Sequence, residues 1–389
     1  MVGKAPPTAA EMPTEREIDR AGLGARITAL EGFTRVRRAA EQAGVEARLI
    51  GGAVRDGLLG RPGPLDVVTD GDHLALAAAL GGEIRPHERF LTATVETPEG
   101  PIDVVRARAE SYPLPGALPE VSPAGYGEDL ARRDFTVNTI AVSVADPGTL
   151  IDSLGGEQDL RRGLLRSLHE RSFVDDPTRA LRGARYAARL GLAVEPRTLE
   201  QLRAAPLETV SADRIEAELR RIAAEVAPRP GFELLDQWGL IALPPGAGDL
   251  VAAAAELLAD EPWSGVAARE DVILAAARGE LEAAAELAGA APRSASEIVE
   301  AARGRSTVEL ALARVLGATW LDRYLEELRE VRLAISGDEL LAAGLPEGPA
   351  IGRGLAAALR AKLDGEAPTR EEELRIAAAA AAADPEASL

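Results

Sequence analysis

Residues 50–66 read IGGAVRDGLLGRPGPLD and carry more information about the fold than any other stretch of the chain. Apolar residues before Gly51 predict a short buried strand, the paired glycines end it, and residues 54–59 have helical spacing. A strand that ends in glycines and opens a helix leaves backbone N–H groups at the helix N-terminus, where a phosphate can bind. The guanidinium of Arg55 can add charge-assisted contacts to the same phosphates. Because a second apolar stretch with one carboxylate, Asp66, follows at once, we expect a phosphate-binding turn beside an acidic strand.

The composition limits the classes of protein to which the chain can belong. Its 389 residues predict two or three domains, and its alanine-rich sequence with 3% aromatic residues favours helices. No segment approaches 18 consecutive apolar residues, so we expect no membrane span. The absence of cysteine excludes disulfides and thiolate metal sites and is consistent with a cytoplasmic protein. The first 24 residues are rich in proline and charge, which predicts a disordered leader.

The net charge of −19, from 44 basic and 63 acidic residues, leaves two interpretations open. Phosphate contacts supply much of the affinity of nucleic-acid-binding proteins, so an acidic chain favours a protein without such a partner. The arginines, however, crowd between Arg161 and Arg203, whereas acidic residues concentrate in the C-terminal half. A locally positive cleft in an acidic protein can still attract a polyanion.

The chain divides into a mixed N-terminal part and a helical remainder. Between residues 25 and 150 we expect a small head that combines strands and helices. Its predicted elements are helices at 25–44 and 72–80, strands at 47–50, 65–69, 93–95, 102–106 and 137–144, and a long loop with prolines from 113 to 123. From residue 159 onward the apolar period is helical, which predicts a neck at 151–225 and a body with a tail at 226–389.

Two further segments carry motifs, namely RRDFTVN at residues 132–138 and DDPTRALRGAR at 175–185. Together with residues 50–66 they resemble the bacterial tRNA nucleotidyltransferase and poly(A) polymerase family, the class II CCA-adding enzymes. The resemblance runs from about Arg48 to Arg221 and continues more faintly to the C-terminus. It implies an α+β fold, with a mixed-sheet head of the polymerase-beta type followed by an all-helical neck, body and tail. It also implies transfer of C or A nucleotides from CTP or ATP to an RNA 3′ end, with tRNA as the favoured substrate.

The metal-binding carboxylates depart from the family pattern. Nucleotidyl transfer uses two divalent ions, and Mg²⁺ prefers carboxylate ligands. Carboxylates at positions i and i+2 of a strand project to the same face, and the resemblance implies such an Asp-x-Asp pair. In this chain Asp66 matches the second aspartate, whereas Pro64 stands in the place of the first. Asp103 matches the third carboxylate of the superfamily, although it can equally be a solvent-facing acid. We expect Asp66 and Asp103 to be the catalytic residues that bind Mg²⁺.

The rest of the nucleotide-binding motifs are present. The resemblance assigns contacts with the triphosphate to Gly51, Gly52, Arg55 and Arg133. It assigns organisation of the site and of the ribose to Asp134 and Asn138, and recognition of the base to Asp176 and Arg179. Two more arginines on the same predicted helix face, three residues apart, are expected to reach phosphates or ribose. These two arginines are Arg182 and Arg185.

Three hypotheses about function follow from this pattern. The first is an active nucleotidyltransferase. The second is a catalytically impaired protein that binds nucleotide or tRNA without turnover, because a metal ligand is missing. The third is an interaction scaffold that has kept the fold, which the base-reading residues disfavour. The sequence leaves complete CCA addition, partial addition and poly(A) synthesis open.

Overall fold

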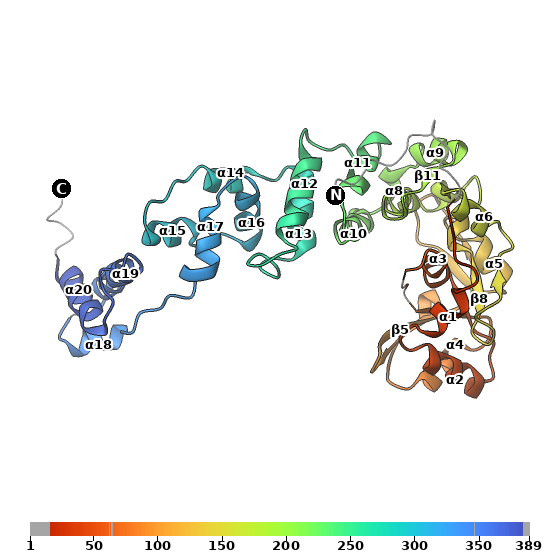
Figure 1. Ribbon diagram of the computed structural model, residues 1–389, viewed down its shortest axis with the longest axis horizontal. Coiled ribbons are helices and arrows are strands. Elements are labelled where there is room, and N and C mark those ends of the chain that lie inside the picture. The colour runs from red at the N-terminus through yellow and green to blue at the C-terminus, as the bar shows by residue number, and fades with distance from the viewer. Residues whose placement is uncertain (1–15, 62, 64, 346, 384–389) are drawn as a thin grey trace. The chain divides into compact units, whose positions relative to one another are not determined.

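The computed structural model describes residues 16–61, 63, 65–345 and 347–383 (Figure 1). The chain forms two compact units, which are described separately below. The first comprises Met1–Glu225 with Pro230–Ala242, and the second comprises Val226–Arg229 with Leu243–Leu389. The first unit therefore combines the parts predicted as head and neck. The leader up to residue 15, and Pro64 in place of the family's first aspartate, lie outside the described residues.

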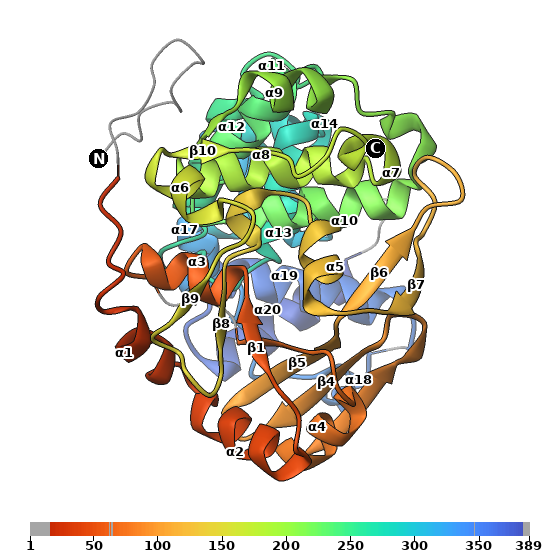
Figure 2. The ribbon, with the colours of Figure 1, turned by 90° about the vertical axis from the view of Figure 1, so that its right-hand side faces the viewer.

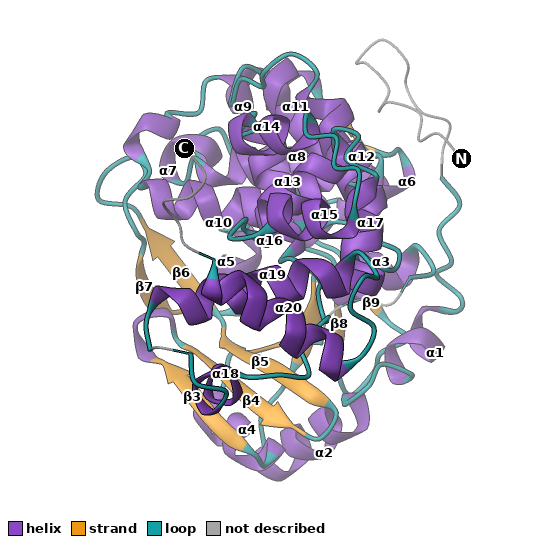
Figure 3. Ribbon diagram, turned by 90° about the vertical axis from the view of Figure 1, so that its left-hand side faces the viewer, coloured by secondary structure: helices purple, strands orange, loops and turns teal. Residues whose placement is uncertain are grey.

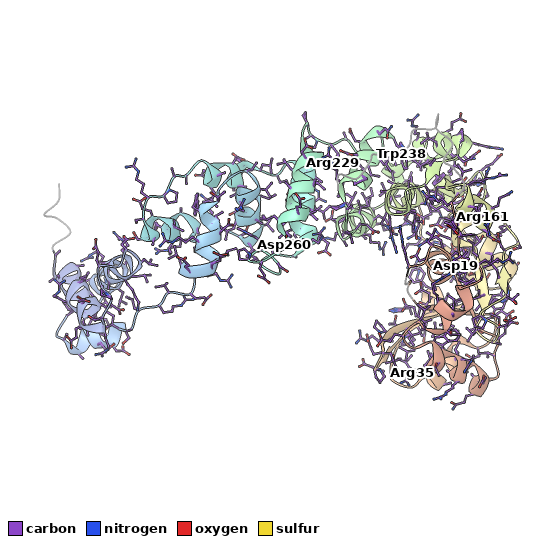
Figure 4. The ribbon with its side chains drawn as sticks, viewed as in Figure 1. Asp19, Arg35, Arg161, Arg229, Trp238 and Asp260 are labelled. Atoms are coloured by element: carbon purple, nitrogen blue, oxygen red, sulfur yellow. The ribbon has the colours of Figure 1, made fainter. Side chains whose placement is uncertain are left out.

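The segment from Arg16 to Gly22, which the sequence assigns to the leader, is packed against the first unit. Ile18 is only 7% exposed, and the N–H of Asp19 donates to the carbonyl of Leu58 at 3.0 Å. Arg16 donates to the carbonyl of Leu190, at 2.6 Å, at the C-terminal end of a neck helix. Asp19, labelled in Figure 4, forms an ion pair with Arg26 at 2.7 Å. The prediction of disorder is wrong here because these partners lie far along the chain and leave no local signal.

A seven-stranded mixed sheet forms the centre of the head. Its order is β3-β4-β5-β2-β1-β8-β9, and within it β2 and β5 pair in parallel whereas the other neighbours are antiparallel. The strand bounds, in this order, are Glu83–His87, Thr92–Thr97, Gly100–Arg106, Asp66–Thr69, Arg48–Ile50, Ala141–Ser143 and Leu150–Ile151. Alternation along β2 and β5 buries Val67 and Val104 on one face and turns Asp66 and Asp103 to the other. The acidic strand predicted from the sequence is therefore confirmed in a central position.

Helices pack beside this sheet in a way that the sequence predicted only in part. The expected helix at 25–44 is two helices, α1 (Leu23–Thr28) and α2 (Phe33–Ala43), because Gly32 adopts a φ of +81° between them. The helix expected at 72–80 is α4 (His73–Leu80), which packs on α2 and on β4 and β5. Asp72 caps α4 by accepting hydrogen bonds from two backbone N–H groups. Helix α3 (Gly52–Leu58) follows β1 directly, as the glycine pair predicted.

A two-stranded hairpin replaces part of the loop expected between residues 113 and 123. Strands β6 (Arg108–Ser111) and β7 (Glu120–Pro123) pair in antiparallel register (Figure 2). Prolines favour loops. The hairpin tolerates Pro123 because this residue stands at the end of β7, where the missing N–H donor has little effect on the pairing of the strands. Helix α5 (Tyr126–Ala131) follows and contacts β6, which brings the chain to the RRDFTVN motif.

The remainder of the described chain is helical, apart from the short pair β10 (Leu164–Leu165) and β11 (Ala193–Val194). Among the described residues every strand belongs to the first unit. Figure 3 draws the strands in orange and the helices in purple. None of the helices in the described ranges has the length and apolar character needed to cross a membrane. The further helices of the first unit are α6 (Gly156–Arg161), α7 (Ser172–Asp175), α8 (Thr178–Leu190), α9 (Pro196–Arg203) and α10 (Ala212–Ala223), and α11 (Arg229–Gln237) begins at the division between the units. Those of the second unit are α12 (Ala247–Leu257), α13 (Arg269–Arg278), α14 (Glu282–Ala288), α15 (Ala295–Ala302), α16 (Thr307–Val315), α17 (Trp320–Arg323), α18 (Gly337–Ala342), α19 (Pro349–Leu363) and α20 (Arg370–Ala382).

Candidate active site

Two carboxylates lie side by side on the open face of the sheet. Asp66 of β2 and Asp103 of β5 are direct partners in the parallel register, and Thr94 of β4 is the partner of Asp103 on its other side. The Thr94 hydroxyl donates to Oδ1 of Asp103 at 2.6 Å. Burial, and then the neighbouring Asp103 carboxylate, raise the pKa of Asp66, whereas Arg133 opposes the rise. Two neighbouring carboxylates in a partly buried place attract a cation.

The glycine turn packs closely against the RRDFTVN motif. Gly51 has a φ of +79°, and a Cβ at this position would lie 3.0 Å from the carbonyl oxygen of Asn138 and 3.4 Å from Nη1 of Arg133. Both the backbone conformation and the space therefore require glycine. Arg55 is only 2% exposed, and its side chain donates hydrogen bonds to Asp56 and to the Asn138 amide oxygen. Arg55 thus orients Asn138, in addition to the predicted phosphate contact.

The two arginines of the RRDFTVN motif share one buried carboxylate, Asp129 of α5. Its Oδ1 accepts from Arg132 at 2.6 Å, and its Oδ2 accepts from Arg133 at 3.0 Å. Burial alone would raise the pKa of Asp129, but Arg133 and Arg132 outweigh it and lower the pKa. Asp129 is fully buried, so both guanidiniums are anchored from beneath the site. Asp129 was not predicted from the sequence, although its position three and four residues before the two arginines, on a predicted helix, is a usable signal.

Asp134 links the sheet to the neck helix α8. Its Oδ1 accepts from the Asn138 side chain at 2.8 Å, and its Oδ2 accepts from Nε of Arg182 at 2.9 Å. Burial alone would raise the pKa of Asp134, but Arg182 and the Asn138 hydrogen bond outweigh it and lower the pKa to about 2. Asp134 therefore holds the motif and α8 together as an ionised group.

The predicted base-reading residues lie at the start of α8, but in different structural settings. Asp176 precedes the helix and has an extended backbone, as residues before proline prefer, so it does not share the helix face of Arg179 as expected. Its Oδ1 accepts from Arg214 at 2.8 Å. Arg179 is 5% exposed and donates to the carbonyls of Arg132, at 2.7 Å, and Arg133, at 3.3 Å. The base-reading role of this pair stays a prediction.

All of the predicted site residues line one cavity of about 630 Å³ within the first unit. The cavity brings together the glycine turn, the sheet face, the RRDFTVN motif and α8, which are far apart in sequence. The predicted residues along its wall are Gly51, Gly52, Arg55, Asp66, Asp103, Arg133, Asp134, Asn138, Asp176, Arg179, Arg182 and Arg185. The predicted phosphate, metal and base regions therefore face a common space.

Other residues of the cavity wall were not predicted. Arg108 and Glu110 of β6, and Tyr112 directly after it, follow a two-residue period and all line the cavity. Glu110 accepts from Arg132 at 2.6 Å. This alternation of polar residues was the signal for a strand, but the prolines that follow concealed it. Tyr186 of α8 also lines the cavity and accepts a hydrogen bond from Arg182 at 3.0 Å.

Comparisons with known proteins agree with this geometry. Residues 47–166 match the family model described as the poly(A) polymerase head domain. The chain is 37% identical over 358 residues to the CC-adding tRNA nucleotidyltransferase of Deinococcus radiodurans, and the match covers 88% of this chain and 91% of that protein. The chain belongs to the tRNA nucleotidyltransferase family. Members of this family are metal-dependent enzymes, and the predicted enzyme class and fold class are confirmed.

Relatives and structures that are named for different nucleotide specificities match the same chain. An A-adding tRNA nucleotidyltransferase of Halalkalibacterium halodurans is 44% identical over 202 residues, which cover 48% of this chain and 47% of that protein. A CCA-adding enzyme in an apo form superposes with a TM-score of 0.74 at 27% identity, covering 94% of this chain and 99% of that structure. The Thermotoga maritima CCA-adding enzyme complexed with tRNA has a TM-score of 0.68 at 25% identity, with 95% and 99% covered. The family is thus established, whereas its members differ in the nucleotides they add.

The low pKa of Asp134 predicts a specific pH dependence of stability. Because its pKa is about 2 in the folded protein and about 3.9 in an unfolded chain, ionised Asp134 stabilises the fold above pH 4. This stabilisation, about 2 kcal/mol, is lost as the pH falls from about 4 to about 2. The free energy of unfolding of the unaltered protein, minus that of Asp134→Asn, should therefore shrink by this amount between pH 5 and pH 2. Urea unfolding at each pH measures it, and a difference that stays constant contradicts the assignment.

Proposed function

We propose that the protein transfers CMP, AMP or both from CTP and ATP to the 3′ end of tRNA. The single cavity that unites Asp66, Asp103, the glycine turn and the arginines of α8 carries this proposal. It is supported by relatives named as CC-adding and A-adding enzymes, and by similar structures of CCA-adding enzymes solved with tRNA, ATP or CTP. We place the activity in the cytoplasm, where the substrates occur together.

The reaction joins an RNA 3′-hydroxyl oxygen to the α-phosphorus of the nucleoside triphosphate. The bond between this phosphorus and the bridging oxygen to the β-phosphate breaks, pyrophosphate leaves, and the hydroxyl proton passes to water. We assign Gly51, Gly52, Arg55 and Arg133 to the triphosphate, and Asp134 and Asn138 to the ribose and to the order of the site. Arg182 and Arg185 would contact phosphate or ribose from α8. These groups position the reactants, which is the main task of the protein in phosphate chemistry.

The donor set on the sheet face suits a hard divalent cation. Asp66 and Asp103 are carboxylates in register, and Mg²⁺ in proteins is commonly held by one or two carboxylates together with substrate phosphates. We propose Mg²⁺ as the ion. When bound, it would polarise the phosphate oxygens and reduce the charge that develops during transfer.

An alternative function is nucleotide or tRNA binding without turnover, which Pro64 favours because proline offers no metal ligand. The close similarity to enzymes over nearly the whole chain favours catalysis instead. Poly(A) synthesis is the second alternative, since the head matches the poly(A) polymerase model.

A direct incorporation assay separates these functions. The protein is mixed with Mg²⁺, labelled CTP or ATP and tRNA that lacks its 3′-terminal CCA, and the 3′ ends of the products are sequenced. We expect one to three added nucleotides of C, A or both. Long runs of A would favour poly(A) synthesis. No incorporation, together with measurable binding of CTP or ATP, would instead identify a binding protein.

The base-reading assignment predicts a change in nucleotide preference. Asp176→Ala and Arg179→Ala should each alter the ratio of kcat/KM for CTP and ATP by about tenfold, since one hydrogen bond to a base edge is worth roughly 1–2 kcal/mol. Asp175→Ala is the matched control because this neighbouring carboxylate pairs with Arg171 and does not line the cavity. Competition assays with both triphosphates measure the ratio. If Asp176→Ala leaves it unchanged, another group reads the base.

A further inference from the structure

The metal-binding end of the cavity has fewer carboxylates than a two-ion site requires. In the two-metal arrangement, ions about 3.5–4 Å apart clamp the attacking and leaving oxygens. Here Asp66 and Asp103 are the in-register acids of this sheet face that line the cavity, whereas the in-register pair Glu83 and Glu96 does not line it. Pro64 stands in the sequence where another aspartate is expected. No group of three or more histidine, aspartate or glutamate residues that could hold a metal ion occurs in the described ranges. The donor set therefore fits one ion and does not fit two.

A fixed positive charge lies beside these carboxylates. Arg133 lines the same cavity, and its Nη1 lies 3.4 Å from where a Cβ on Gly51 would be, so it borders the glycine turn directly. The guanidinium therefore lines the same cavity as the two carboxylates and borders the glycine turn that is expected to bind the triphosphate.

The hydrogen bonds of Arg133 leave donors available for a ligand. Its Nε and Nη2 donate to Asp129, and its Nη1 donates to the carbonyl of Asn138. These bonds use three of the five N–H groups that a guanidinium carries, so two remain. Since Asp129 holds the side chain from the buried side, the remaining donors are oriented in advance. Arg55, in contrast, is buried and bonded on two of its nitrogens by Asp56 and Asn138.

We propose that this site binds a single divalent ion between Asp66 and Asp103, and that Arg133 supplies the second positive charge at the substrate phosphates. The inference rests on the proposed function, because it assumes that a nucleoside triphosphate occupies the cavity. A guanidinium is permanently charged and matches the spacing of phosphate oxygens, so it can neutralise charge without a carboxylate ligand. The chain would then differ from the two-ion pattern of its family in how it stabilises the phosphates.

Counting bound Mn²⁺ tests the first half without turnover. Electron paramagnetic resonance measures free and bound Mn²⁺ in a titration of the full chain with α,β-methylene-CTP, which cannot be cleaved; a sample without protein gives the ions held by the analogue alone. We expect one bound ion per chain and two for Pro64→Asp. Two ions in the unaltered chain would overturn the proposal, and one ion in a correctly folded Pro64→Asp variant would overturn the role given to Pro64. Circular dichroism and thermal unfolding check that the variant is folded.

The second half is tested by the affinity for the same analogue in the presence of Mn²⁺. Arg133→Gln should weaken binding by about 10- to 100-fold, as expected for loss of a charge-assisted contact, while the number of bound ions stays at one. Arg38→Gln removes the same charge from an exposed position on α2 and should have no effect. Equal affinity of Arg133→Gln and the unaltered chain would overturn the role of Arg133. Failure of the incorporation assay alone would leave the ion count and the affinities standing, so the two proposals fail separately.

Discussion

Asp66→Asn should lower the rate of nucleotide incorporation by about a thousandfold or more. Asp66 is in register with Asp103 on the cavity side of the sheet, and its carboxylate is one of two that can hold a cation there. Loss of a metal ligand removes several kcal/mol of stabilisation from the transition state, and about 4 kcal/mol corresponds to three orders of magnitude in rate. Single-turnover incorporation of labelled CMP into tRNA without its CCA end measures the effect.

A matched control makes this result specific. Asp70 lies four residues further along, is exposed and does not line the cavity, so Asp70→Asn changes the same charge without touching the site. Its rate should stay within about twofold of that of the unaltered protein, as is usual for surface substitutions. If both variants lose activity equally, the effect comes from net charge or folding, and the assignment of Asp66 is wrong.

Asp129→Asn should lower both the stability of the protein and its affinity for nucleotides. Asp129 is fully buried and accepts hydrogen bonds from Arg132 and Arg133. Removing one partner of a buried ion pair typically costs about 3–5 kcal/mol, because the remaining charges stay in a poorly solvated place. We expect a decrease in the free energy of unfolding of about 3 kcal/mol, measured by urea denaturation.

The effect on nucleotide binding follows from the same contacts. Without Asp129 the Arg133 guanidinium loses the acceptor of its Nε and Nη2, so its orientation toward the cavity is no longer fixed. The affinity for α,β-methylene-CTP should fall about tenfold even under conditions where the variant is folded. Glu128→Gln, at the neighbouring exposed position of α5, keeps the N-terminal cap of the helix and should change neither quantity. An Asp129→Asn variant with normal stability would show that the two arginines need no buried counter-charge.

The sequence predicted the parts of the site that depend on local pattern. The glycine pair predicted the strand, turn and helix of residues 48–58. The apolar stretches around Asp66 and Asp103 predicted two strands, which pair in parallel register in the structure. Residues with distant partners were not predictable in this way. Arg16 donates hydrogen bonds to carbonyls at the end of α8. Glu110 pairs with Arg132 and lies in a hairpin whose following prolines favoured the prediction of a loop. Pairing across the chain is a property of the folded structure, and a window of local sequence does not contain it.

The contacts of Arg179 have a consequence for changing the nucleotide specificity of this enzyme. One guanidinium donates to the main chain of both Arg132 and Arg133, so the group assigned to recognise the base also braces the segment assigned to hold the phosphates. A mutation that replaced Arg179 in order to change the base preference would also lower the affinity for every nucleotide. A change of specificity is therefore easier through Tyr112, which lines the cavity, accepts a hydrogen bond from Arg179 and can be replaced while Arg179 keeps its bonds to the main chain.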